Sequence, residues 1–119
     1  MPELTDPTTR RLLLDGLSVS ERGDGVECLP VAAEELRRLC PRATVPGLVK
    51  AICTWVRAGK RVEECEEWRE EYSGMFRYHY DVRISVAGRR LYVEMRLLIE
   101  GSDAEVVIVS IRPDDSRKG

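Results

Sequence analysis

The fold is decided by residues 75–112, MFRYHYDVRISVAGRRLYVEMRLLIEGSDAEVVIVSIR. Apolar and polar side chains alternate over 76–86, which is the period of two expected of a strand with one buried face. A second alternating run covers 91–99, and a third run over 106–111 is rich in β-branched residues. The stretch therefore predicts three antiparallel strands.

The register of the first hairpin depends on which two residues form its loop. A loop at 87–88 would place Asp81 opposite Glu94, and like charges directly opposite each other destabilise a sheet. A loop at 88–89 instead pairs Asp81 with Arg96 and puts glycine in the first loop position, as a type II′ turn requires. We expect the second register.

The second connection is expected to be a three-residue loop at 102–104, which would place Val107, Val109 and Ile111 on the buried face. Exposed cross-strand ion pairs contribute about 0.2–1 kcal/mol each, so such pairs would add modestly to stability. In this register the polar face carries a connected set of charged side chains: Asp81, Arg83, Glu94, Arg96 and Arg112.

The chain before these strands is expected to form a hairpin and helices. Alternating runs on both sides of a glycine-rich turn predict a β-hairpin over 17–29. Apolar stripes at helical spacing predict helices over 30–40 and 44–59. The glutamate-rich segment 62–72 has helical spacing too, with an irregular or strand-like segment as the alternative. The expected fold is α+β, with two or three helices on one face of a three-stranded antiparallel meander and a short N-terminal β-hairpin.

Length and composition describe one domain. The 119 residues carry a formal net charge of −2, which argues against a strongly basic nucleic-acid binder. No run approaches the ~20 apolar residues of a membrane span, so we expect a cytoplasmic protein without a membrane partner. A single α+β domain is expected over 10–113, between flexible tails at 1–9 and 114–119.

The cysteine pattern indicates free thiols. None of the four cysteines forms a Cys-x-x-Cys pair, and the only histidine, His79, lies far from most of them in the chain. Structural zinc sites usually bring their ligands in close pairs, so we expect neither a metal nor another cofactor. Buried free thiols are expected at Cys28, Cys40, Cys53 and Cys65.

No strong catalytic motif is present: the sequence has no phosphate-binding glycine loop, nucleophile elbow or His-Glu-x-x-His zinc motif. His79 is expected on the polar face of the sheet. It is either an exposed strand histidine or a general acid or base, because an imidazole changes charge near neutral pH.

Three short pieces of the sheet resemble the RelE-type ribonuclease toxins of bacterial toxin–antitoxin systems. The closest local likeness is to the motility quorum-sensing regulator toxins, and it covers about the last third of the chain. The matching pieces are Asp81-Val82-Arg83, Gly88-Arg89-Arg90-Leu91-Tyr92-Val93-Glu94 and Val107-Ile108-Val109-Ser110-Ile111-Arg112.

This resemblance implies metal-independent cleavage of RNA, in which a ribose 2′-hydroxyl attacks the adjacent phosphate. RNA and an antitoxin protein would be the partners. The implied catalytic residues are His79, Tyr92 and Arg112, and the implied substrate-binding residues are Arg77, Arg83 and Arg96.

A non-enzymatic interaction module remains the alternative. Its binding surface would be the polar sheet face or the acidic helix over 62–72. The expected exposure of Leu98 and Ile108 would then mark a contact with a partner or a second copy in a homodimer.

Overall fold

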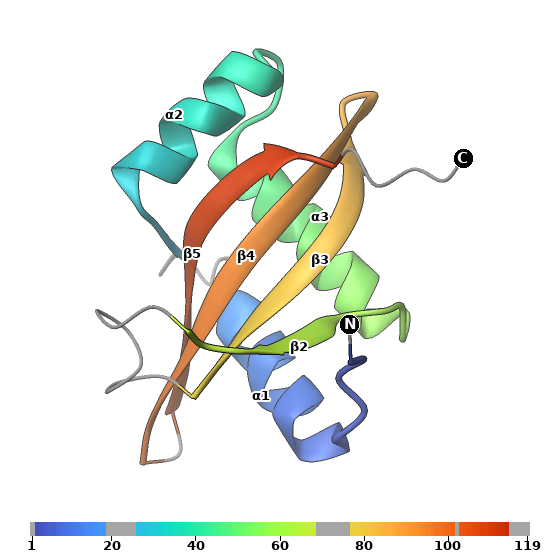
Figure 1. Cartoon of the computed structure of the whole chain (residues 1–119), viewed down its shortest axis with the longest axis vertical. Coiled ribbons are helices and arrows are strands. Elements are labelled where there is room, and N and C mark those ends of the chain that lie inside the picture. Colours follow the sequence, from blue (N-terminus) through green and yellow to red (C-terminus); the bar gives the residue numbers. More distant parts are fainter. Residues whose placement is uncertain (1, 19–25, 69–76, 102, 115–119) are drawn as a thin grey trace.

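The computed structural model describes residues 2–18, 26–68, 77–101 and 103–114, which form three helices and a five-stranded sheet. The helices pack against one side of the sheet (Figure 1), with α1 and α2 on β5 and α3 on β3. Along the chain the elements are α1 (Pro7–Ser18), β1 (Glu27–Cys28), α2 (Pro30–Leu39), α3 (Val45–Arg57), β2 (Glu63–Glu66), β3 (Tyr78–Val86), β4 (Arg89–Glu100) and β5 (Asp103–Pro113).

The sheet has the order β1-β5-β4-β3-β2, with β1 parallel to β5 and every other pair antiparallel. The expected three-stranded antiparallel meander with an N-terminal hairpin is therefore wrong: the meander is present, but two short strands extend it. Each added strand satisfies backbone N–H and C=O groups along an edge of the meander that would otherwise stay unpaired.

Both added strands come from segments with another expected structure. The hairpin over 17–29 is wrong, because Leu17 belongs to α1 and Glu27 pairs with Val107 of β5; the expected turn at 23–25 lies outside the described residues. Over the described part of 62–72 the expected helix is wrong and the strand-like alternative is correct, since β2 runs there. A helical stripe would have buried Trp68, yet this side chain is 81% exposed.

The β3–β4 hairpin adopts the register that we rejected. Val86 pairs with Arg89, so residues 87–88 form the loop and Asp81 lies opposite Glu94. Both loop residues have positive φ angles, 51° and 79°, as a type I′ turn requires. The like-charge penalty is avoided because each carboxylate has its own hydrogen-bonding or ionic partners, described below.

A β-bulge interrupts the β4–β5 pairing. Glu94 pairs with Ser110 and Met95 with Ile108, so Val109 is the extra residue on β5. The expected loop at 102–104 is wrong, because Asp103 already pairs with Glu100, and of the expected buried set Val107, Val109 and Ile111 only Ile111 is buried. The β5 residues that reach the core are Val106, Ile108 and Ile111. Ile108, expected to be exposed at a partner contact, is fully buried.

The two central helices were predicted close to their observed bounds. α2 begins at a proline, and the side chain of Thr44 caps α3 by accepting a hydrogen bond from the Gly47 N–H at 3.0 Å. Their apolar faces and the helix-facing side of the sheet form one core that includes Leu48, Ile52 and Val93.

The N-terminal segment 2–6 lies against β2. The Leu4 N–H donates to the Val62 carbonyl at 2.7 Å, and the Leu4 side chain is buried. Of the expected C-terminal tail, residues 115–119 lie outside the described residues. Within the described ranges, no helix has the length and apolar character needed to cross a membrane.

The β3–β4 turn gives the first testable prediction. Gly88→Ala should lower the free energy of unfolding by about 1–2 kcal/mol, because a Cβ is disfavoured at a φ of 79°. Ala87→Asn should raise it by about 0.5–1 kcal/mol, since asparagine suits the first position of a type I′ turn. Urea unfolding measures both changes. A loss of stability on Ala87→Asn would contradict this turn.

Candidate functional site

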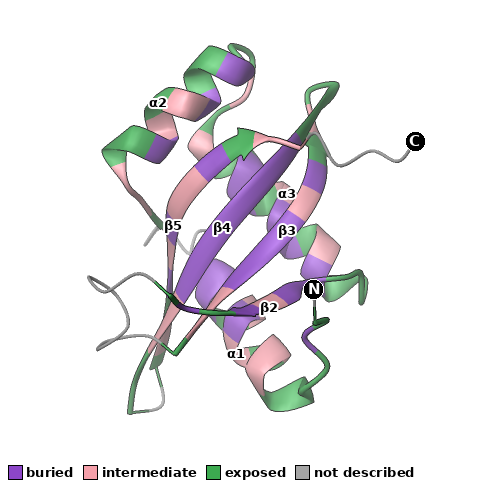
Figure 2. Ribbon diagram, in the orientation of Figure 1, coloured by how far each residue is buried: buried purple, intermediate pink, exposed green. Residues whose placement is uncertain are grey.

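The sheet face that points away from the helices is polar yet buried. Six consecutive residues of β4, 91–96, are buried, so both faces of this strand are covered (Figure 2). On the polar face, Asp81, Glu94 and Arg96 are only 0%, 3% and 1% exposed. Charged groups buried this deeply must be paired or hydrogen-bonded, because desolvation of an unpaired charge is very unfavourable.

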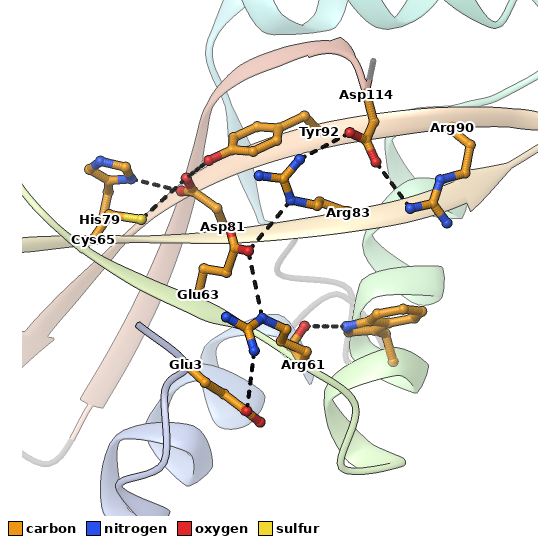
Figure 3. A network of polar contacts seen from close by, with 11 residues as sticks. Glu3, Arg61, Glu63, Cys65, His79, Asp81, Arg83, Arg90, Tyr92 and Asp114 are labelled. Carbon is orange, nitrogen blue, oxygen red and sulfur yellow. Dashed lines mark hydrogen bonds and ion pairs between the residues drawn. The ribbon is translucent and has the colours of Figure 1, made fainter. Parts of the chain in front are cut away.

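Asp81 stands at the centre of this face. Its Oδ1 lies 2.7 Å from His79 Nδ1, its Oδ2 accepts a hydrogen bond from the Tyr92 hydroxyl, and the Cys65 Sγ lies 3.7 Å from the same Oδ2 (Figure 3). We call these four residues, Cys65, His79, Asp81 and Tyr92, the Asp81 cluster. A single buried carboxylate therefore connects side chains from three strands.

The strand pairing brings the cluster together. His79 and Asp81 are two residues apart on β3, so both point to the same face. Cys65 of β2 pairs directly with His79, and Tyr92 of β4 pairs with Arg83, two residues along β3 from Asp81 and therefore on the same face. The cluster therefore depends on the β3–β4 register and on β2, neither of which the sequence indicated.

Burial controls the protonation of the cluster. Desolvation raises the pKa of Asp81, while hydrogen bonds from Tyr92 and His79 oppose that rise. Desolvation, together with the nearby Asp81 charge, raises the pKa of the Cys65 thiol to about 12. Desolvation and the bond to Asp81 likewise raise the pKa of Tyr92. At neutral pH Cys65 and Tyr92 therefore keep their protons.

Two arginines lie over the Tyr92 ring. The guanidinium carbons of Arg83 and Arg112 are 4.6 and 4.4 Å from the ring centroid, within the range of cation–π contacts. Arg83 also takes part in ion pairs. Arg112 is exposed at the surface, and within the described ranges it has no ion pair. Arg112 is therefore the cation that this part of the sheet presents to solvent.

The carboxylates beside the cluster are paired with arginines. Glu63 Oε2 lies 3.6 Å from Arg61 Nε and 3.5 Å from Arg83 Nε. Asp114 binds Arg83 and Arg90, each at 3.0 Å (Figure 3). These ion pairs compensate the negative charge near the cluster and hold Arg83 beside Tyr92.

The structure brings together the three residues to which catalysis was assigned. His79 and Tyr92 both bind Asp81, and Arg112 lies over the ring of Tyr92. Of the arginines assigned to substrate binding, Arg83 also lies over the ring of Tyr92. Arg77 is exposed and lies 5.6 Å from the Tyr78 ring, at the start of β3.

Arg96, the third arginine assigned to substrate binding, is instead buried in ion pairs that stabilise the fold. Its Nη1 lies 2.8 Å from Glu94 Oε2, and its Nη2 forms an ion pair with Glu67. The side chain is only 1% exposed, so a substrate at the surface cannot reach it. Arg96 neutralises the buried carboxylates on the polar face.

Sequence reasoning missed two members of the cluster. Cys65 was placed on an expected helix, although the alternation of buried Glu63, Cys65 and Glu67 with more exposed residues is the pattern of a strand. Asp81 was assigned to a surface ion pair. The sequence could have indicated its contact with His79, because the two residues are two apart on one strand and therefore share a face.

Among the residues that the structure describes, two sets of side chains have ligand atoms within 4.8 Å of one another and could share a metal ion. The first is Cys65, His79 and Asp81, and the second is Glu67, His79 and Glu94. Both use the imidazole that pairs with Asp81.

The chain matches no family model, and no significantly similar protein was found among curated proteins or solved structures. Any functional assignment therefore has to come from the geometry of the site.

The position of Arg96 gives the second prediction. Arg96→Ala should lower the free energy of unfolding by about 3–5 kcal/mol, because it leaves Glu67 and Glu94 buried without their cation. Arg112→Ala, on the same face but exposed, should lower it by about 1 kcal/mol or less. Urea unfolding compares the two variants. Equal losses would contradict the structural role of Arg96.

Proposed function

We propose that the Asp81 cluster and Arg112 form an acid–base site that cleaves phosphodiester bonds in RNA without a metal. The observation that carries the proposal is the 2.7 Å contact between His79 Nδ1 and the buried Asp81 carboxylate. Beside this pair, the guanidinium of Arg112 lies over the ring of Tyr92. The likeness to RelE-type toxins supports the same function. By that likeness, an antitoxin protein would be its inhibitory partner.

His79 would act as the general base. A carboxylate that accepts the Nδ1–H fixes the imidazole tautomer and leaves the Nε2 lone pair to accept a proton. The ribose 2′-hydroxyl gives its proton to Nε2 as the bond between its oxygen and phosphorus forms. The bond from phosphorus to the 5′-oxygen breaks, and that oxygen takes a proton from water. The products are a 2′,3′-cyclic phosphate and a 5′-hydroxyl.

Arg112 would hold the phosphate. Its planar guanidinium can bind two phosphate oxygens and stabilise the negative charge that develops during attack. Tyr92 would be a positioning residue, because its hydroxyl donates to Asp81 and its ring supports the guanidinium. The slightly acidic composition does not oppose this role, since the carboxylates beside the cluster are paired with other arginines.

The third prediction tests this function. We expect the wild-type protein to cleave RNA of mixed sequence, either as purified protein in the presence of EDTA or in a translating extract without EDTA. His79→Ala and Arg112→Ala should each slow cleavage about 100-fold or more. Arg112→Ala should leave the melting temperature nearly unchanged, whereas His79→Ala should lower it because Asp81 loses a hydrogen-bond donor, and circular dichroism checks that both variants are folded. Arg89→Ala is the matched control, because this exposed arginine lies at the β3–β4 turn, outside the cluster, and should cleave normally.

Cleavage that persists in both His79→Ala and Arg112→Ala would contradict the proposal, since the activity would then belong to another site or a contaminant. Absence of wild-type cleavage in both settings would also contradict it.

The second candidate function, an interaction module, is favoured by one observation. Trp68, just beyond β2, is 81% exposed, and a large aromatic side chain in that position can anchor a partner protein or a second copy in a homodimer. Absence of cleavage together with loss of self-association in Trp68→Ala would support this second function.

A further inference from the structure

We propose that Cys65, His79 and Asp81 form a binding site for a zinc ion. This inference goes beyond the proposed function, which needs no metal. The three side chains offer a thiolate sulfur, an imidazole nitrogen and a carboxylate oxygen, which are the three ligand types that zinc uses in proteins. Their ligand atoms all lie within 4.8 Å of one another.

The distances fit an ion at the centre of the three residues. With bonds of about 2.3 Å to sulfur and 2.0–2.1 Å to nitrogen and oxygen, tetrahedral ligand atoms lie roughly 3.3–3.6 Å apart. The Cys65 Sγ lies 3.7 Å from Asp81 Oδ2, close to this range. The 2.7 Å contact between His79 Nδ1 and Asp81 Oδ1 is held by a proton, and it has to lengthen to about 3.3 Å when an ion replaces that proton.

The strand pairing holds these ligands in place. Cys65 and His79 are direct partners across β2 and β3, and Asp81 is two residues farther along β3. Ligands on paired strands vary less in position than ligands on loops. The Tyr92 hydroxyl, which donates to Asp81 Oδ2, supplies the kind of outer partner that orients a metal-binding carboxylate.

The charges also favour a divalent cation. Asp81 is 0% exposed and Cys65 is buried, so two negative ligands there are unfavourable without a cation. A thiolate and a carboxylate together neutralise Zn²⁺ when the imidazole is neutral. The His79 side chain is 14% exposed and gives the ion a route from solvent. Binding would release the thiol proton of Cys65.

The second group of potential ligands is less suitable. Glu67 and Glu94 both pair with the buried Arg96, whose positive charge would repel a metal ion. Arginine cannot lose its proton in a protein to relieve that repulsion. We therefore assign the zinc to Cys65, His79 and Asp81.

One consequence rests on the proposed function. A metal on Nδ1 of His79 leaves the imidazole proton on Nε2, which then cannot accept a proton from the 2′-hydroxyl. The zinc-bound protein would therefore be an inactive form of the proposed ribonuclease.

Cobalt substitution tests the zinc site directly. Co²⁺ is added to the full-length, reduced, metal-free protein, and the absorption spectrum is recorded. We expect the near-ultraviolet charge-transfer band of a thiolate–cobalt bond and the strong visible bands of tetrahedral cobalt, saturating at one ion per chain. One equivalent of Zn²⁺ should remove both.

Two variants and a control identify the ligands. Cys65→Ser should abolish the charge-transfer band, and His79→Gln should weaken binding by more than the 10–100-fold typical of outer-shell changes. Cys28→Ser, a change to a half-buried thiol on β1, should keep the full spectrum. Circular dichroism confirms that each variant is folded.

A folded wild-type protein without the cobalt bands would overturn the proposal, as would bands that persist in Cys65→Ser. Because this titration contains no RNA and the cleavage assay with purified protein contains EDTA, failure of one proposal is distinguishable from failure of the other.

Discussion

The burial of one carboxylate, Asp81, constrains the whole polar side of the sheet. At 0% exposure its charge cannot be solvated by water, so nearby side chains have to provide hydrogen-bond donors. His79 provides one from the same strand, and Tyr92 provides another from β4. The β3–β4 register that places Tyr92 there also places Asp81 opposite Glu94.

A second group of buried charged side chains, Glu67, Glu94 and Arg96, stabilises this register. Glu94 is neutralised by Arg96, which also binds Glu67 just beyond β2. The two carboxylates that face each other, Asp81 and Glu94, therefore each have their own compensating partners, although the charge of Glu94 still helps to raise the pKa of Asp81. Breaking either group would leave an unpaired charge in a low-dielectric interior, and such charges are far more destabilising than an unfavourable exposed pair.

The strand periodicity predicted β3 and β4 and much of β5, and helical spacing predicted α2 and α3, because each depends on local sequence. Alternation predicted a strand at β1 but gave it the wrong partner, and it offered β2 only as an alternative to a helix. These two strands are two and four residues long, and their positions are set by pairing with strands far along the chain. The β-bulge at Val109 was missed for a related reason, since one extra residue leaves the alternation of its neighbours almost unchanged.

The register prediction failed because it used the energetics of exposed charges. An exposed like-charge pair is unfavourable by less than about 1 kcal/mol, and that difference is decisive only when both groups face water. Here Asp81 and Glu94 are buried, and their other partners determine the register. The resemblance assigned His79, Tyr92 and Arg112 to one site, but only tertiary structure shows that Asp81 connects two of them and that Cys65 lies beside it.

The most direct measurement of this arrangement is the nitrogen-15 NMR spectrum of the imidazole, which is unambiguous because His79 is the only histidine in the chain. In metal-free protein at neutral pH, the account predicts a proton on Nδ1 that exchanges slowly with water, and a clear change in both nitrogen shifts in Asp81→Asn. An imidazole with its proton on Nε2, exchanging freely and unaffected by Asp81→Asn, would contradict the central role of the buried carboxylate.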